Sequence, residues 1–513
     1  MQRICSERSE RSSRPEVSDG AIFPLCVESF GGNGGKLCLE AFCHTGYNGA
    51  QSQLGYLGAS VELYLASRRI ILISYVLLFS VNHFLQIHLL SLISYFLLFL
   101  IVILTLPVLG KTNRIVSLGM VLAGSAILLV TGTSFSIWLE AFSRNAALAA
   151  LLITIPMLNI PFSYGDYQEQ IKMFAKRHVR SPLMFCFLAM LLSHLFGLII
   201  LVGAIPLVYH LFSENAKLYG AEKQFISALV HGQVFGGFWS PVWSSMIILT
   251  AALDIPWLQF VPLGIAMSVL ALFSSMVRCR FSLKRSHAIT LAREDHGRDD
   301  GKILLMIGVL TLLPIILIVL LNWLTGLSII TVIPMVSVLF PVIIAAFQRR
   351  WGAYRSGMGS YVSTRILGVK NEVVLLTAAG FFGKALEIAN VQSAVRYLIP
   401  EGAAQVPYLA IVSIMSVYII TAHFGLHPVV AGSAMVVSLD PAVIGLSPYM
   451  FGFTLMCGWA IGILLSPFSA TNMVTGGLTA QPSWNISAKM HGLYGLVLLC
   501  GIAAILTILA RFL

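Results

Sequence analysis

Apolar runs of roughly 20 residues recur along the chain from Ile70 to Phe512 and are separated by short polar or basic loops. A helix of this length, rising about 1.5 Å per residue, spans the roughly 30 Å hydrocarbon core of a bilayer. The pattern therefore predicts membrane crossings over residues 70–88, 89–109, 115–138, 146–164, 182–210, 257–277, 303–322, 328–347, 371–388, 406–438 and 489–511.

Two further apolar stretches, 224–253 and 447–480, are interrupted in the same way. Each holds a serine-proline pair followed by hydroxyl residues, and the two sets correspond at one constant offset. The corresponding residues are Ser240 and Ser466, Pro241 and Pro467, Ser245 and Thr471, and Pro256 and Pro482. A proline in mid-segment with glycines nearby favours a broken helix over a straight one.

We interpret each interrupted stretch as a re-entrant hairpin of two half-length helices. The predicted fold is an all-α polytopic membrane protein with two inverted repeats, about 11 transmembrane helices and two re-entrant hairpins. Its parts are a flexible cytoplasmic tail (1–65), a leading helix with the first repeat and hairpin 224–253 (66–277), a basic cytoplasmic linker (278–302), and the second repeat with hairpin 447–480 (303–513).

The basic residues support this topology. The formal net charge is +11, and Lys and Arg collect in short loops such as 278–302 and 348–370. Positively charged loops are typical of the cytoplasmic side, which places the N-terminus inside. The outer loops hold few basic residues: Arg144, Lys217, Lys223, Arg396 and Arg511. If 224–253 crossed in addition to the other predicted spans, the linker would lie outside. The charge pattern thus indicates membrane topology and not nucleic-acid binding. We expect the protein in a bacterial-type cytoplasmic (inner) membrane.

The composition agrees with a membrane protein. Hydrophobic residues make up 58% of the 513 residues, charged residues only 10%, and the mean hydropathy is +0.88. A soluble protein would carry about 25% charged residues. The eight cysteines form no Cys-x-x-Cys pair, so we expect neither a metal site nor a disulfide framework.

The two hairpin tips are the candidate binding site. Ends of half-helices inside a membrane offer free N–H groups to anions, and exposed carbonyl and hydroxyl oxygens suit a small cation such as Na⁺. The candidate residues are Ser240, Ser244 and Ser245 at the first tip and Ser466, Ser469, Thr471 and Asn472 at the second. The structural alternative is that these hydroxyls bond to their own helices and the prolines merely bend them.

The architecture resembles the ion transporter superfamily, and its divalent-anion:sodium symporters in particular. The resemblance covers residues 70–513. It implies that the tips 240–245 and 466–472 bind a carboxylate beside sodium sites, and that the protein is a homodimer. The chain departs from the family pattern, because neither tip reads Ser-Asn-Thr and only the second holds a Thr471-Asn472 pair.

Four further polar residues in predicted crossings are candidate coupling residues. Lys384 and Glu387 lie three apart on one helix face, where they either serve in function or form an ion pair with each other. His423 and His427, just before Pro428, are candidates for a proton relay or a substrate contact.

The predicted function is secondary active transport of a small anion or carboxylate by alternating access, driven by a Na⁺ or H⁺ gradient and without a cofactor. No Gly-x-x-x-x-Gly-Lys pattern is present, which argues against ATP as the direct energy source. The alternative within transport is a cation:proton antiporter with Asp254, Glu387 or a histidine as proton carrier. Rival classes are an intramembrane enzyme, which would need clustered acids or a His-Glu-x-x-His site, and a structural membrane subunit.

Overall fold

The computed structural model describes residues 25–26, 38–39, 47–165, 167–283, 300–391 and 406–512, without side chains for 47–60 and Gln168. Most of the predicted tail 1–65, most of the linker 278–302, and the loop that holds Arg396 lie outside the described residues.

The chain divides into two compact units, Met1–Ser67 and Arg68–Leu513. In the first unit, β1 (Leu25–Cys26) pairs antiparallel with β2 (Cys38–Leu39), with Leu25 opposite Leu39. Helix α2 (Tyr47–Leu85) begins in this unit and continues into the second. The predicted leading helix 70–88 is the last part of α2, and the stretch Val61–Leu85 is long and apolar enough to cross a membrane.

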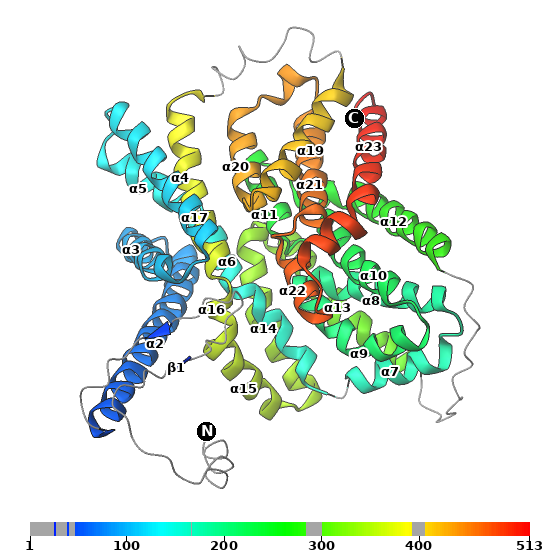
Figure 1. Ribbon diagram of the computed structural model, residues 1–513. Helices are drawn as coiled ribbons and strands as arrows, with labels where there is room; N and C mark the ends of the chain where they lie inside the picture. The colour runs from blue at the N-terminus through cyan, green and yellow to red at the C-terminus, as the bar shows by residue number, and fades with distance from the viewer. Residues whose placement is uncertain are drawn as a thin grey trace, which may run out of the picture. The chain divides into compact units, whose positions relative to one another are not determined.

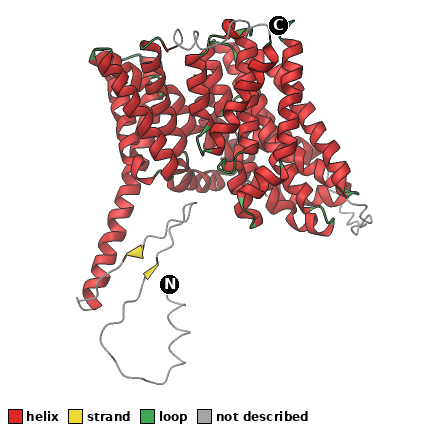
Figure 2. Ribbon diagram, turned by 45° about the horizontal axis from the view of Figure 1, so that its top comes forward, coloured by secondary structure: helices red, strands yellow, loops and turns green. Residues whose placement is uncertain are grey.

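The second unit is helical throughout its described residues (Figures 1 and 2). Its elements after α2 are α3 (His88–Thr105), η1 (Leu106–Val108), α4 (Lys111–Val130), α5 (Phe135–Ser143), α6 (Ala146–Thr154), η2 (Ile155–Ser163), α7 (Tyr167–His178), α8 (Pro182–Ile200), η3 (Leu201–Gly203), α9 (Ala204–Leu218), α10 (Glu222–Phe235), η4 (Gly236–Phe238), α11 (Ser244–Leu253), α12 (Trp257–Ser282), α13 (Asp300–Thr325), α14 (Ile329–Gln348), α15 (Trp351–Ser360), η5 (Tyr361–Arg365), α16 (Ile366–Gly368), α17 (Lys370–Ile388), α19 (Pro407–His423), α20 (Pro428–Ser438), η7 (Pro441–Ile444), α21 (Pro448–Leu465), α22 (Ala470–Thr479), η8 (Asn485–Met490) and α23 (Gly492–Leu509).

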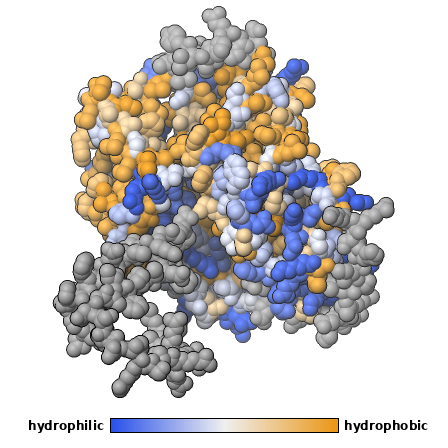
Figure 3. Space-filling view, viewed as in Figure 1, coloured by the Kyte–Doolittle hydropathy of each residue, from blue (hydrophilic) through white to orange (hydrophobic). Residues whose placement is uncertain are grey.

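The chain is an all-α polytopic membrane protein, as the sequence predicts. Within the described residues, 10 helices are long and apolar enough to cross a membrane, or up to 11 if one bent pair counts as a span. Large apolar side chains such as Leu122 and Phe273 are exposed, as expected of residues that face lipid. Figure 3 shows hydrophobic residues over much of the visible face, with hydrophilic ones gathered near α7, α9 and α22.

Two spans run antiparallel beside each other, one from each half of the chain. The first consists of α5, α6 and η2, and the second of α15, α16 and α17, with a 48° bend between Gly368 and Lys370. Asn145 Nδ2 donates to Leu376 O at 2.8 Å, and Tyr361 OH donates to Ile153 O at 2.8 Å. These contacts join the two antiparallel spans along their length.

The first half contains a helical hairpin that the sequence analysis placed elsewhere. Residues 182–210 were expected to cross the membrane, but the chain reverses at Leu201–Gly203, and α9 returns along α8. The ring of Phe185, near the start of α8, lies 6.1 Å from Phe212 and 5.3 Å from Tyr219. A straight helix would hold residues 27 positions apart about 40 Å away from each other. Leu201 makes the turn with a φ of +56°.

The second half contains the equivalent hairpin, formed by α19 and α20. The predicted crossing 406–438 reverses at residues 424–427, where Gly425 adopts a φ of +76° that a side chain would disfavour. A Cβ on Gly432 of α20 would lie 2.8 Å from the hydroxyl of Tyr418 on α19, which places the two arms in contact.

The stretches 224–253 and 447–480, predicted as hairpins, are instead broken spans that continue across. They run past each other in opposite directions: Gly452 of α21 packs on Leu253 at the end of α11, and Thr471 of α22 bonds to Gln233 of α10. The prediction failed because buried hairpin arms are apolar on every face and so resemble a single crossing.

This exchange leaves the sidedness of the later loops unchanged, because each half of the chain still contributes one crossing and one hairpin. It does move Lys217 and Lys223, which the sequence analysis assigned to the outer side. Tyr219 OH donates to Val179 O at 3.4 Å, and Gln224 Nε2 donates to Ser282 O at 3.0 Å. Both lysines therefore lie at the same end as Arg180 and the linker, so the basic residues are more one-sided than predicted.

Candidate functional site

The two helix breaks are built alike around Ser240 and Ser466. Ser240 Oγ donates to Leu198 O at 2.6 Å and accepts from Val242 N at 3.3 Å. Ser466 Oγ donates to Ala422 O at 2.8 Å and accepts from Phe468 N at 3.1 Å. Each serine thus links a broken span to the neighbouring hairpin arm, at the end of that arm that leads into the hairpin turn. Each serine also stabilises backbone groups that a break leaves unpaired.

The half-helices that follow the breaks begin differently. Helix α22 is capped by Ser469, whose hydroxyl accepts from Asn472 N at 3.2 Å. Helix α11 follows Trp243, and no side chain caps its first N–H groups. Because uncapped N–H groups carry partial positive charge, the start of α11 is the better place for an anionic group.

Ser244 and Ser245 are the first two residues of α11. Ser245 is buried. Ser244 faces a small cavity of about 10 Å³, whose lining includes Glu372 at the start of α17 and Val429 at the start of α20.

The second break makes a direct contact with α10, in the first half of the chain. Thr471 Oγ1 donates to Gln233 Oε1 at 3.0 Å, and both residues are buried. The neighbouring Asn472 donates from Nδ2 to Leu464 O at 2.9 Å and to Ser466 O at 2.8 Å. Asn472 thereby holds the carbonyls at the end of α21, which a broken helix leaves without partners.

Two polar atoms in this contact have no hydrogen-bond partner among the described residues: Gln233 Nε2 and Asn472 Oδ1. Each would cost about 1–3 kcal/mol if left unpaired in a dry interior. Gln233 Nε2 is a hydrogen-bond donor and Asn472 Oδ1 is an acceptor, so together they can bind a small polar or ionic ligand. These atoms mark the second break as the centre of the candidate site.

Glu372 is an acid that the sequence analysis did not single out. It lies in the first turn of α17, beside the bend that follows Gly368, and its Oε2 is buried without a hydrogen-bond partner among the described residues. The small cavity separates it from Ser244. A carboxyl with one buried oxygen that lacks a hydrogen-bond partner, beside a helix break, is a candidate proton or cation carrier.

The two candidate histidines lie on either side of the second hairpin turn, not on one helix face. His423 ends α19, and its Nδ1 lies 2.8 Å from Ile419 O. His427 Nδ1 accepts from Val429 N at 3.3 Å and caps α20. The turn that carries them is next to Ala422, which accepts the hydrogen bond from Ser466.

Lys384 and Glu387 lie away from the breaks, at the end where α17 packs on α5. Lys384 Nζ is 3.0 Å from Glu387 Oε1 and 2.9 Å from Glu140 Oε1, and Arg144 also pairs with Glu387. The carboxylates are largely exposed. This arrangement corresponds to the ion-pair alternative, extended to four residues.

Asp254, a candidate proton carrier in the antiporter alternative, ends α11 in a left-handed conformation with a φ of +53°. Within the described part of the chain, no three His, Cys, Asp or Glu side chains are placed to hold a metal ion together. A sodium site built from hydroxyl and carbonyl oxygens at the breaks is a separate kind of site.

No protein-family model and no curated protein matches the sequence. Among solved structures, the chain is similar to the YdaH transporter of Alcanivorax borkumensis, whose crystal structure was described as having an unusual topology. The overlap has a TM-score of 0.49 at 15% sequence identity and covers 74% of this chain and 88% of that one.

The structure brings together the motif residues of each break and adds two residues that the sequence analysis missed. Gln233 is an amide in the apolar second half of α10, and Glu372 lies at the edge of the predicted crossing 371–388. A search for every amide and acid in or beside an apolar run would have found both.

Proposed function

We propose that this protein is a secondary active transporter that moves a small anion or carboxylate by alternating access. The observation that carries the proposal is the matched pair of helix breaks, each tied by a serine to the end of a hairpin arm. Broken backbone is tolerated at membrane depth where it is buried in protein or lines a path for a polar substrate.

In this proposal the two breaks bind different parts of the substrate. The uncapped start of α11 attracts the negative group of the substrate. Gln233 Nε2 and Asn472 Oδ1 supply a donor and an acceptor at the second break. Na⁺ or H⁺ is the coupling ion, with hydroxyl and carbonyl oxygens of residues 466–472 as ligands for Na⁺ or Glu372 as carrier for H⁺.

In this proposal the broken spans and the hairpins rock together against a scaffold. The scaffold consists of α5, α6 and η2, of α15, α16 and α17, and of the neighbouring helices α4 and α14. The hairpin arms pack on the broken spans, which favours motion of these elements as one body. The resemblance to symporters also suggests a homodimer, which we keep as part of the proposal.

The decisive experiment is uptake into proteoliposomes of purified protein, after a thermal-shift screen of carboxylates and inorganic anions with and without Na⁺ has identified a ligand. Thr471→Val removes the hydroxyl that bonds to Gln233 and should reduce uptake by about 10-fold or more. Thr475→Val is the matched control, because the Thr475 hydroxyl donates to Thr471 O within its own helix at 2.7 Å. Equal uptake by the two variants would sink the proposed site.

A cation:proton antiporter is the second candidate, favoured by the unpaired Oε2 of Glu372. Proton release from proteoliposomes on addition of Na⁺ or K⁺, without any organic substrate, would support antiport. Cation-independent uptake of an anion would exclude it.

A further inference from the structure

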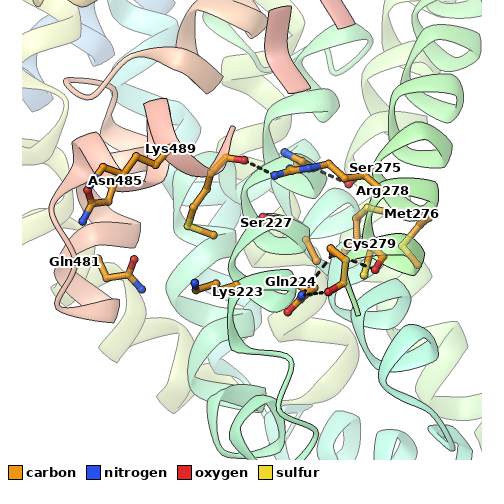
Figure 4. A pocket seen from close by; sticks show the side chains of 15 residues that line it. Lys223, Gln224, Ser227, Ser275, Met276, Arg278, Cys279, Gln481, Asn485 and Lys489 are labelled. Atoms are coloured by element: carbon orange, nitrogen blue, oxygen red, sulfur yellow. Dashed lines mark hydrogen bonds between the residues drawn. The ribbon is translucent and has the colours of Figure 1, made fainter. Parts of the chain in front are cut away.

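One cavity has no residue of the two helix breaks in its lining. It has a volume of about 380 Å³ and is lined by residues of α10, α12 and the segment that follows α22 (Figure 4). Ligand pockets in proteins commonly measure about 300–1,000 Å³, so this cavity is large enough for a headgroup or a small molecule.

Three cationic side chains from these three segments line the cavity: Lys223, Arg278 and Lys489. Gln224, Gln481 and Asn485 add side-chain amides, and none of the lining residues is acidic. In Figure 4, Lys489, Asn485 and Gln481 lie on one side of the cavity, opposite Arg278. Cations without an acidic neighbour repel each other unless an anion lies between them.

Arg278 is held in place by the protein. Its guanidinium donates to Met490 O and lies 5.4 Å from the ring centroid of Tyr494. A guanidinium has five N–H donors in a fixed fork that matches phosphate and carboxylate. Lys223 and Lys489 are exposed, and no ion pair joins any of the three cations to an acid among the described residues.

The cavity lies beside surfaces that face lipid. Val269, Phe273 and Val277 of α12 are exposed, and so are Leu493, Leu496 and Val497 of α23, which begins directly after the lining segment. Arg278 ends the apolar part of α12 where the basic linker 278–302 begins. Cations between transmembrane helices at this depth are a recurrent feature of sites for anionic lipid headgroups.

We propose that this cavity binds the phosphate group of an anionic phospholipid from the leaflet on the basic side. Arg278 holds the phosphate, Lys223 and Lys489 close around it from α10 and from the segment after α22, and the acyl chains lie along the exposed stripes of α12 and α23. Because the headgroup joins the start of one broken span to the chain after the other, the lipid stabilises one arrangement of the two repeats.

The test uses the purified full-length protein in a neutral detergent, titrated with phosphatidylglycerol or with phosphatidylcholine. Phosphatidylglycerol should raise the melting temperature and phosphatidylcholine should not. In a variant with Lys223→Gln, Arg278→Gln and Lys489→Gln, affinity for phosphatidylglycerol should fall about 100-fold, since each cation near an anionic surface contributes roughly a fivefold factor.

The matched control carries Lys176→Gln, Lys217→Gln and Arg355→Gln, which removes the same charge from exposed positions outside the cavity. It should keep the wild-type affinity. If the triple cavity variant does not fold, Lys489→Gln alone, followed by native mass spectrometry of bound lipid, gives the same comparison with about a fivefold loss.

Three outcomes would overturn the proposal. The control variant could lose as much affinity as the cavity variant, phosphatidylcholine could bind as tightly as phosphatidylglycerol, or inorganic phosphate at the same concentration could reproduce the whole thermal shift. The last result would assign the cavity to a free anion and not to lipid.

Discussion

Thr471 and Gln233 form a hydrogen bond that joins the two halves of the chain where one broken span passes the other. The Thr471 hydroxyl donates at 3.0 Å to the amide oxygen of Gln233, and the amide nitrogen of the same Gln233 has no partner among the described residues. One side chain thus links the second break to the first repeat and still presents a free donor to a ligand.

Gln233→Met keeps the length of this side chain and removes both the oxygen and the nitrogen of its amide. We expect it to abolish uptake in proteoliposomes, because neither the link to Thr471 nor the free donor remains. In a double-mutant cycle with Thr471→Val, the thermal unfolding of the detergent-purified protein should show a coupling free energy of about 1 kcal/mol. Additive effects would mean that the hydrogen bond contributes nothing to the folded state.

Glu372→Gln mimics the protonated acid. If Glu372 carries the coupling proton, an imposed pH gradient should no longer drive accumulation, while exchange of labelled for unlabelled substrate should continue. The matched control is Glu387→Gln, because exposed ion pairs contribute only about 0–1 kcal/mol to stability and Lys384 keeps Glu140 as a partner. Accumulation that persists in Glu372→Gln under the same pH gradient would exclude Glu372 as the proton carrier.

Gly232→Ala should destabilise the contact between α8 and α10. The added Cβ would lie 2.3 Å from Met190 O, a backbone atom that cannot move without shifting the helix. Overpacking of this kind costs about 1–3 kcal/mol, so the melting temperature should fall. Gly308→Ala in α13 meets nothing within 4 Å and should be neutral or stabilising by about 0.5–1 kcal/mol.

Lys217→Cys, in a cysteine-free background, tests the hairpin formed by α8 and α9. We expect a membrane-impermeant maleimide to label it from the same side as Lys172→Cys of α7, because α9 returns to the end from which α8 starts. Ser134→Cys, in the loop between α4 and α5, should react from the opposite side. Labelling of Lys217→Cys together with Ser134→Cys would restore residues 182–210 as a crossing.

The sequence predicted the fold class because apolar runs and the one-sided distribution of Lys and Arg are direct consequences of the bilayer. It misplaced the hairpins because their turns carry weak signals: Leu201 makes the first turn, and the arms on both sides are apolar and buried. The serine-proline pairs resembled tips, yet Ser240 and Ser466 hold breaks in continuing spans.

Part of the candidate site could also be predicted from the sequence. The repeated motif located Thr471 and Asn472, and the hydrogen-bond partners of Asn472 lie close to it in the chain. Gln233 and Glu372 join the site only through tertiary packing between residues more than 100 positions apart, which no local pattern encodes. Lys384 and Glu387 had the right spacing for an ion pair, but their partners on α5 come from the other repeat.

The returning arm of each hairpin packs on the half-helix of the other repeat, α9 against α22 and α20 against α11. During synthesis, α9 leaves the ribosome roughly 250 residues before α22, an interval of about 12–50 s at common elongation rates of about 5–20 residues per second. For that time the first hairpin has its neighbours α7, α10 and α12, but the face of α9 that packs on α22 has no native partner and has to be covered by lipid or the insertion machinery. The order of translation therefore makes completion of the second half the step that locks the first half in place.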